Sequence, residues 1–456
     1  MDRSFFLFPD RRRVAFDRIG VKPKEEDMAE SGSIGARLAA WQDDLDPVAP
    51  QAGSMGAGDG LSGQGGLSAT GGLSAALEEE YLSRWRSPGL AAAVRIRTSL
   101  VFALQEFLVK RGLANIDRVS LSPVTDPLCH GVEHAPEISY RGVPYRTTHS
   151  MIYSKMLACM NPALAGVYID SPNIRLELPE PAGVQRGKYL IDFSQMDIEV
   201  RRREPLSEAD YFGEPERSAA TLEAERDRAL DFFEDMIVHA VSAIARDSGD
   251  ALSALGVALE VPVKPFPRFF KDEDAEGEKG LEMRLGKKAG TQFFWVLGLL
   301  RENYDLVYPY LRADGSKPVR GEIPSRSVYN YDLCAASRML DGKLGDAFEV
   351  LSGGLREWVY PAIVERLVDN GIIAEKPRFT AGGRLENMEA LAGYGPFLAA
   401  ARSRGSRGES FFPQTFGGGL GIERTLYALL RGPVVEKIED VTFFGKNPDS
   451  SGIFLF

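Results

Sequence analysis

The sequence has 456 residues, a formal net charge of −11 at pH 7 and 44% hydrophobic residues. Its apolar stretches fall far short of the roughly 18 to 20 residues that a membrane span needs, and its N-terminal apolar run is too short for a signal peptide. Three unpatterned cysteines cannot form a disulfide framework, which favours a reducing cytoplasm, and the acidic balance disfavours a dedicated nucleic-acid binder.

Composition divides the chain into three parts. Residues 1–45 are charge-rich and predict a short arm. Residues 46–76 repeat Gly-Leu-Ser at Gly60, Gly66 and Gly72, which is typical of a flexible linker. Residues 77–456 have the composition of one globular unit, which we expect to be the catalytic domain.

Helices and strands alternate irregularly in this third part. Apolar spacing predicts a helix over Ser99–Gly112 and a long helix over Ser207–Asp247, which carries acidic residues near its start. Strand-like segments cover 118–123, 138–148, 167–178, 189–200 and parts of 329–357, and a glycine-rich strand or turn leads into a helix over 422–430. The absence of regular βαβ alternation favours an α+β fold with an antiparallel sheet.

A glycine cluster occupies Gly417–Gly419 and Gly421, and Arg424 follows it. Glycines let a flat or charged ligand approach the backbone, and a guanidinium can bind phosphate or stack on a purine. The segment lacks the Gly-Lys-Ser/Thr ending of a P-loop and the context of a dinucleotide signature. A tight turn with a surface arginine is an equally good interpretation.

Two strand segments place chemistry-bearing residues on one face. Arg175 and Glu177 are two residues apart, as are Phe193, Gln195 and Asp197. The first pair would project a cation and an acid together, and the second set would place an aromatic ring beside polar groups. A cross-strand ion pair and a solvent-facing strand are the plain alternatives.

Acidic residues near a second glycine pair suggest a metal site. Asp332, Asp346 and Glu349 are oxygen donors suited to Mg²⁺, and Arg356 can bind a carboxylate with two hydrogen bonds. An acidic surface loop is the alternative. The four histidines show no zinc-ligand spacing, and a Gly-x-Ser-x-Gly nucleophile motif is absent.

In this order, the segments resemble the three signature motifs of class II aminoacyl-tRNA synthetases, most closely the aspartyl/asparaginyl branch. The segment Phe193-Ser-Gln-Met-Asp-Ile-Glu199 is similar to the second motif. His149-Ser150…Lys155 and Asp346…Arg356 also resemble ammonia-dependent asparagine synthetase, which shares the catalytic core. The resemblance covers roughly residues 90–445 and implies a class II synthetase-like antiparallel sheet flanked by helices.

The resemblance implies roles for the matching residues. Two arginines would be catalytic, at Arg175 and Arg424. The ATP site would include Arg175, Glu177, Phe193, Glu349, Gly421 and Arg424, and Mg²⁺ would bind Glu349 with Asp332 or Asp346. The amino acid would contact Lys155, Ser150, Gln195, Asp197, Ser352 and Arg356. Tyr189 departs from the family pattern, which has a histidine near the γ-phosphate.

We therefore expect an AMP-forming ligase that converts aspartate and ATP into an aspartyl-adenylate and transfers it to ammonia or another amine. The cation at Lys155 suits aspartate better than asparagine, because a buried carboxylate needs a paired charge. We expect a cytoplasmic homodimer without membrane contact. We do not expect tRNA as a partner, because the charge is acidic and no anticodon-binding barrel is recognisable.

Two alternatives stay open. One is an aspartyl- or asparaginyl-tRNA ligase, or a carrier-aminoacylating enzyme, that manages without the barrel. The other is a non-catalytic synthetase paralogue that binds a nucleotide without turnover.

Overall fold

The computed structural model describes residues 82–123, 137–176, 188–274, 276–277, 280–300, 304–338, 343–406 and 408–446. The chain separates into two units, residues 1–62 and 63–456, and all the described residues lie in the second unit. The predicted arm (1–45) and linker (46–76) lie outside the described residues, so the predicted domain boundaries stay predictions.

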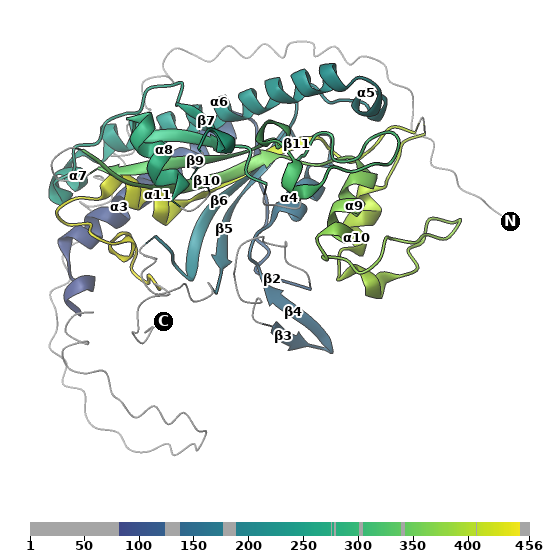
Figure 1. Cartoon of the computed structure of the whole chain (residues 1–456). Coiled ribbons are helices and arrows are strands. Elements are labelled where there is room, and N and C mark those ends of the chain that lie inside the picture. Colours follow the sequence, from purple (N-terminus) through teal and green to yellow (C-terminus); the bar gives the residue numbers. More distant parts are fainter. Residues whose placement is uncertain are drawn as a thin grey trace, which may run out of the picture. The chain divides into compact units, whose positions relative to one another are not determined.

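An eight-stranded mixed sheet forms the centre of the second unit (Figure 1), in the order β1-β5-β6-β11-β10-β9-β8-β7. The six strands from β5 to β8 pair antiparallel, whereas β1 and β7 pair parallel at the two edges. The predicted α+β class is confirmed, with parallel pairing confined to those edges. The strands are β1 (Ala114–Asn115), β5 (Gly166–Ile174), β6 (Asp192–Arg201), β7 (Arg268–Phe270), β8 (Phe293–Leu297), β9 (Asn330–Arg338), β10 (Leu344–Leu355) and β11 (Thr415–Gly421).

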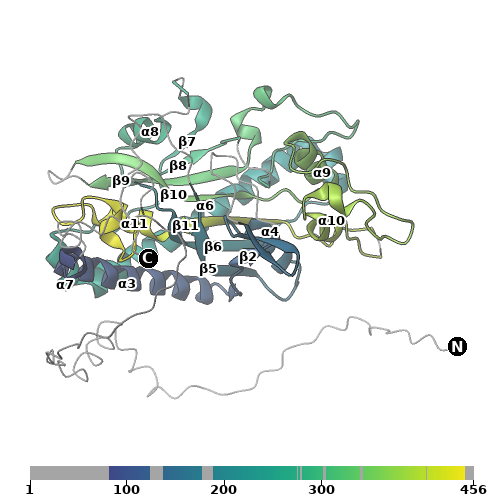
Figure 2. The same ribbon diagram turned by 90° about the horizontal axis from the view of Figure 1, so that it is seen from below.

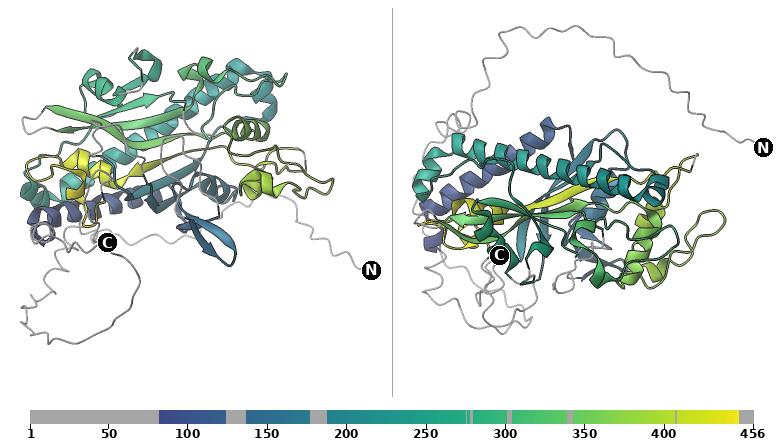
Figure 3. Two further views of the ribbon diagram at one scale, coloured as in Figure 1. Left: turned by 60° about the horizontal axis from the view of Figure 1, so that its bottom comes forward. Right: turned by 45° about the horizontal axis from the view of Figure 1, so that its top comes forward.

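One face of the sheet is covered by helices α3 (Pro88–Lys110), α6 (Pro215–Asp247), α7 (Gly249–Leu255) and α11 (Ile422–Leu430). Figure 2 shows α3 running lengthwise beside α7 and α11, and Figure 3 shows α6 crossing the sheet. Phe233 of α6 contacts the rings of Tyr331 and Phe416, and Glu234 accepts a hydrogen bond from Trp295 Nε1 at 2.9 Å. The main apolar core lies between these helices and the sheet.

The opposite face of the sheet is covered in part. Helix α8 (Leu281–Ala289) packs Leu281 and Leu285 against β8, β9 and β10, and α4 (Ile152–Ala158) contacts β5 and β6. Helices α9 (Tyr360–Asp369) and α10 (Gly395–Ala401) stand together at one end of the sheet (Figure 1). Between α8 and α4 this face carries the polar residues Gln195, Asp197, Asp332 and Ser352, so we call it the polar face.

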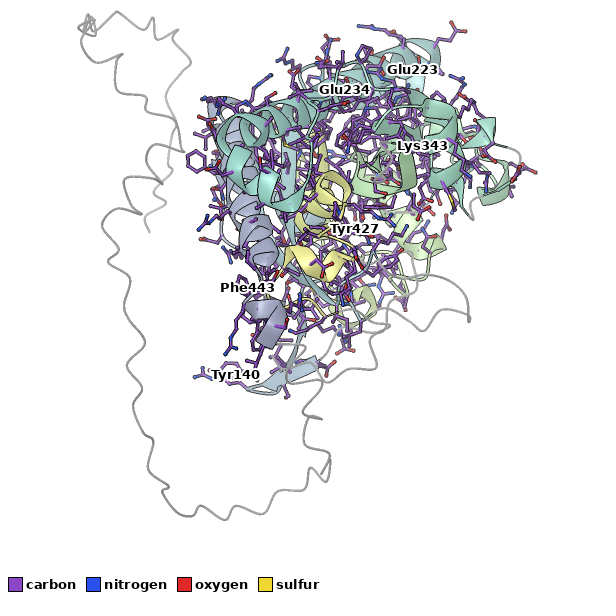
Figure 4. All side chains as sticks on the ribbon, turned by 90° about the vertical axis from the view of Figure 1, so that its left-hand side faces the viewer. Tyr140, Glu223, Glu234, Lys343, Tyr427 and Phe443 are labelled. Atoms are coloured by element: carbon purple, nitrogen blue, oxygen red, sulfur yellow. The ribbon has the colours of Figure 1, made fainter. Side chains whose placement is uncertain are left out.

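A second sheet of three strands projects from the unit. It consists of β2 (Leu121–Ser122), β4 (Val143–Thr147) and β3 (Glu137–Tyr140), in that order. Figure 4 shows Tyr140 at the far end of this hairpin, away from Tyr427 on α11. The short 3₁₀ turns of the chain cover Lys271–Glu273, Arg320–Glu322, Ser325–Ser327, Met388–Leu391 and Ile438–Val441.

Two predicted helices differ from the observed ones at their boundaries. The first begins at Pro88 rather than Ser99, because proline is tolerated in the first turn, where its missing N–H has no partner to lose. The long amphipathic pattern splits into α5 (Glu208–Gly213), which Ser207 caps, and α6, which begins at Pro215. Among the described helices, none combines the length and hydropathy needed to cross a membrane.

A buried carboxyl group lies where β10 leads into α9. Glu357 accepts hydrogen bonds from the backbone N–H groups of Trp358 and Val359 at 3.0 and 3.1 Å. Complete burial raises the pKa of Glu357 to about 7, although Arg366 and Arg202 oppose the shift. Because the folded-state pKa lies above the unfolded value, the folded protein holds a proton that the unfolded chain releases between about pH 4.5 and 7.

We predict that this group makes the protein less stable as the pH rises through that window. Glu357→Gln cannot ionise, so the free energy of unfolding of the wild type should fall relative to the variant by up to about 3 kcal/mol between pH 4.5 and 7. Thermal or urea unfolding of both proteins across this range measures the difference. Parallel stability curves would contradict the assignment.

Candidate active site

A pocket opens on the polar face, where β6, β10 and β11 meet the start of α11. It brings together six of the predicted site residues, from four parts of the chain: Arg175, Phe193, Gln195, Glu349, Gly421 and Arg424. It also contains residues to which the sequence assigned no firm role, namely Lys188, Tyr189, Leu190, Val350, Gly419, Glu423 and Ile438.

Strand register places the predicted amino-acid contacts in one row beside this pocket. Asp332 pairs with Ser352, Ser352 with Gly419, and Gly419 with Asp197. Directly paired residues project to the same face of a sheet, and Gln195 lies on that face two residues before Asp197. The sheet therefore gathers polar groups that lie far apart in the sequence.

Arg175 is held in place by a backbone carbonyl. Its Nε and Nη2 donate hydrogen bonds to His149 O at 3.2 and 3.0 Å, and its guanidinium lies 5.2 Å from the ring centroid of Phe193. These contacts fix the orientation of a positive charge at the pocket wall. Such a preoriented cation can stabilise negative charge without reorganising during a reaction.

Arg424, which also lines the pocket, is held in a similar way. Its Nε donates to Lys188 O at 3.1 Å, its Nη1 lies 3.5 Å from Glu349 Oε1, and its guanidinium stacks 4.8 Å from the ring centroid of Tyr189. Tyr189, the departure from the family histidine, thus serves as an aromatic support for Arg424. Nothing in the sequence indicates this stacking, because the two residues are 235 positions apart.

Glu423 is a second pocket residue whose role the sequence did not indicate. It accepts a hydrogen bond from Ser194 N at 2.9 Å and lies 3.6 Å from Arg97. Burial raises its pKa above the ordinary value, while the hydrogen bond from Ser194 opposes the shift. Glu423 therefore fastens the start of α11, and with it Arg424, to β6.

The lysine predicted to face the substrate is completely buried. Lys155 Nζ donates to Asp197 Oδ1 at 2.9 Å and to Ile198 O at 3.4 Å. The second oxygen of this carboxylate, Asp197 Oδ2, is buried and has no hydrogen-bond partner within the described part of the chain. Lys155 and Asp197 thus form a neutral pair that retains an unused acceptor.

Arg356 is buried next to two carboxylates, and we call Arg356, Glu199 and Asp305 the buried ion cluster. Its Nε is 3.2 and 3.3 Å from the two carboxylate oxygens of Glu199, and its Nη1 is 3.0 Å from Asp305 Oδ1. Thr415 donates to Glu199 at 2.6 Å, and Asn330 donates to Asp305 at 2.9 Å. Both charged contacts of Arg356 are with the protein itself, so its predicted contact with a substrate stays a prediction.

The three acidic residues predicted to bind Mg²⁺ separate in the structure. Glu349 lines the pocket, and Asp332 lies on the same face because Glu349 pairs with Cys334, two residues along β9. Asp346 is exposed, does not line the pocket and lies 3.8 Å from Arg431. No cluster of three or more ligating side chains occurs among the described residues. Glu349 and Asp332 fit Mg²⁺, which takes one or two carboxylates and completes its shell with water and phosphate.

Two further predicted residues contribute less to the described site. Ser150 is buried just before α4 and does not line the pocket. Glu177 lies outside the described residues, so its predicted contact with adenine stays a prediction.

The glycine cluster has two uses in the structure. A Cβ atom at Gly417 would collide with Glu199 Oε2, and one at Gly354 would lie 2.6 Å from Asp305 Oδ1. These glycines make room for the buried ion cluster rather than for a ligand. Gly419 and Gly421 line the pocket, and their predicted contact with a ligand stays a prediction.

The comparisons with known proteins agree with this arrangement. No family model matches the sequence. The chain is 23% identical over 319 residues to the aspartate–tRNA(Asp) ligase of Thermococcus kodakarensis and 24% identical over 328 residues to the aspartate–tRNA(Asp/Asn) ligase of Methanoculleus marisnigri. Each match covers 68% of this chain, and the chain spans about 64% of the length of these relatives.

Solved structures support the same fold. The asparaginyl-tRNA synthetase of Pyrococcus horikoshii, complexed with asparaginyl-adenylate, matches with a TM-score of 0.58 and 17% identity over 82% of this chain and 73% of that chain. The aspartyl-tRNA synthetase of Entamoeba histolytica matches with a TM-score of 0.54 and 16% identity over 84% of this chain and 64% of that one. The fold is that of the class II aminoacyl-tRNA synthetases. The resemblance to the aspartyl/asparaginyl branch is confirmed.

These findings correct one expectation. We expected from the acidic charge that tRNA would not be a partner, and this expectation is wrong, because the similar proteins are aspartate–tRNA ligases. Net charge describes the whole molecule, whereas nucleic acid responds to the local distribution of charge. A total of −11 therefore does not exclude a tRNA-binding surface.

The glycines that accommodate the buried ion cluster yield a prediction about stability. Gly417→Ala should lower the free energy of unfolding by more than about 2 kcal/mol, because the added Cβ displaces Glu199 from Arg356 and strands buried charge. Gly421→Ala is the matched control in the same strand, since its nearest contact would lie at 3.7 Å and its φ of −71° suits alanine. Urea unfolding measures both variants, and equal losses would contradict the assignment.

Proposed function

We propose that this protein is a ligase that activates aspartate with ATP as an aspartyl-adenylate and transfers the aspartyl group to tRNA. The observation that carries the proposal is the pocket on the polar face. There, two oriented arginines and two aromatic rings adjoin the row that leads to the buried Lys155–Asp197 pair. The names of the similar ligases support tRNA as the acceptor.

The residues that line the pocket suit ATP. Phe193 offers a flat ring to adenine, and Arg175 would bind the α-phosphate, where charge develops during attack. Arg424, supported by Tyr189, would bind the remaining phosphates or stack on the base. Glu349 and Asp332 would hold Mg²⁺, which neutralises phosphate charge when it is bound.

The row of polar side chains beside the pocket suits an amino acid with a negatively charged side chain, although Lys155 and Asp197 do not line the pocket themselves. Lys155 would contact its carboxylate, and Asp197 Oδ2, which has no described partner, would accept from a donor on the substrate. Similar structures include both aspartyl and asparaginyl enzymes. Lys155 has three N–H donors, and Asp197 and Ile198 use two of them, so one remains for a substrate carboxylate. The names of the similar ligases also support aspartate.

The reaction balances in two steps. A carboxylate oxygen of aspartate attacks the α-phosphorus of ATP, the bond to the β-phosphate oxygen breaks, and pyrophosphate leaves. The terminal ribose hydroxyl of tRNA then attacks the acyl carbon, AMP leaves with the bonding electrons, and the hydroxyl proton passes to solvent. The protein supplies orientation and electrostatic stabilisation, and no covalent enzyme intermediate is required.

Ammonia or another amine is the second candidate acceptor, and the sequence initially favoured it. It rests on the resemblance of His149–Lys155 and Asp346–Arg356 to ammonia-dependent asparagine synthetase. The comparisons support tRNA more strongly, because the acceptor in the names of the similar ligases is tRNA. An amine would replace the ribose hydroxyl in the second step and leave the first step unchanged.

The purified protein should catalyse pyrophosphate exchange into ATP that depends on aspartate and Mg²⁺. Adding bulk tRNA should then yield aspartyl-tRNA, whereas adding ammonium should not yield asparagine. Radiolabelled exchange and mass spectrometry of the products measure the two steps. Nucleotide binding without any exchange would support the non-catalytic alternative, and asparagine formation would support the amine acceptor.

Two lysine substitutions test which residues contact the amino acid and which contact ATP. Lys155→Met should raise the Michaelis constant for aspartate about tenfold or more and leave that for ATP nearly unchanged, because one charge–charge contact is lost. Lys188→Met, at the nucleotide end of the pocket, is the matched control and should raise the constant for ATP instead. Steady-state exchange kinetics measure both constants, and an unchanged aspartate constant in Lys155→Met would count against its role.

A further inference from the structure

A buried amide lies directly behind the pocket. Asn173, on β5, is completely buried on the polar face, because its pairing partner Phe193 lies on the same face as Gln195. Asn173 Nδ2 donates hydrogen bonds to Ser171 O at 3.2 Å and to Gln195 Oε1 at 3.0 Å. It does not line the pocket itself, but Gln195 does.

The backbone carbonyl of Ser171 decides which way both amides point. A carbonyl oxygen can only accept, so the group of Asn173 that faces it must be the NH₂ group. The same NH₂ group contacts Gln195, so the atom of Gln195 at this contact must be its carbonyl oxygen. Both amide orientations therefore follow from one fixed acceptor.

This leaves the NH₂ group of Gln195 on the pocket side. Gln195 Nε2 lies 3.4 Å from where a Cβ on Gly419 would be, and Gly419 lines the pocket too. Gln195 Nε2 makes no hydrogen bond to a described residue, and the side chain is half-buried. The pocket thus receives an oriented donor that has two N–H bonds and no protein acceptor within the described residues.

We infer that Asn173 is a positioning residue that makes Gln195 a hydrogen-bond donor to the reacting carboxyl oxygen of the amino-acid substrate. This inference rests on the proposed function. It adds a group that selects substrates with a hydrogen-bond acceptor opposite Gln195 Nε2. Without Asn173, Gln195 is free to present its carbonyl oxygen, which repels a carboxylate. In the activation step such a donor holds the substrate carboxylate in place, and in the transfer step it stabilises the negative charge that grows on the acyl oxygen as the acceptor attacks.

Asn173→Asp is the sharpest test, because a carboxylate keeps the shape of the side chain and loses both donated hydrogen bonds. Gln195 then turns its NH₂ group toward Asp and its carbonyl oxygen toward the pocket. The aspartate Michaelis constant in pyrophosphate exchange should rise about tenfold or more, while the ATP constant stays within about twofold.

Ser171→Ala is the matched control. Ser171 is on the same strand, equally buried, and its Oγ has no hydrogen-bond partner within the described part of the chain, but it does not contact Gln195 through its side chain. This variant should leave the aspartate constant within about twofold. Equal effects of Ser171→Ala and Asn173→Asp would mean that a general disturbance of β5 is responsible, and would overturn the inference.

A double-mutant cycle tests whether Asn173 acts through Gln195. In a Gln195→Ala background, Asn173→Asp should add no further increase in the aspartate constant, because no amide remains to orient. Fully additive effects would overturn the inference, since a merely structural role of Asn173 would persist in that background.

The failure of this inference can be distinguished from the failure of the proposed function. If wild-type protein shows no aspartate-dependent exchange, the proposed function fails, and titration calorimetry with a non-hydrolysable aspartyl-adenylate analogue replaces the kinetic readout. Analogue binding that weakens about tenfold in Asn173→Asp but not in Ser171→Ala supports the inference. Equal binding by wild type and Asn173→Asp, or no binding by wild type, overturns it.

Discussion

The site depends on the burial of Arg356 between Glu199 and Asp305, which takes three charges out of water where β6 and β10 end and β11 begins. Such a cluster is tolerable only when every charge is paired closely, because each isolated ion would cost several kcal/mol. Glycines at Gly417 and Gly354 provide the necessary space, since a side chain at either position would meet a carboxylate. The cluster therefore joins β6, the end of β10 and β11, the three strands that meet at the pocket.

Alternate residues of β6 show how one strand serves both stability and chemistry. Phe193 and Gln195 are half-buried at the pocket, whereas Asp197 and Glu199 are buried against Lys155 and Arg356. Along this face, β6 passes from uncharged side chains at the pocket to buried carboxylates that contact cations. The strand therefore gives half-buried groups to the pocket at one end and ion pairs to the protein interior at the other.

Much of the fold and part of the site could be predicted from the sequence. Period-two spacing of Phe193, Gln195 and Asp197 predicted their common face, and the order of the motifs predicted the synthetase-like sheet. The stacking of Arg424 on Tyr189 and the ion pair between Arg356 and Asp305 could not be predicted, because they join segments that only tertiary packing brings together. Net charge misled us about tRNA for the same reason, since it carries no information about position.

The pairing of β6 with β11 joins segments more than 200 residues apart, and β11 has four glycines among its seven residues. Glycine-rich strands have little tendency to order by themselves, and closing such a long loop is entropically costly. We therefore expect the pairing of β6 with β11 to form late in folding, after the neighbouring strands β5 and β10 are in place. In a nascent chain the pocket would then be incomplete until β11 and α11 have left the ribosome, because Gly419, Gly421 and Arg424 arrive with them.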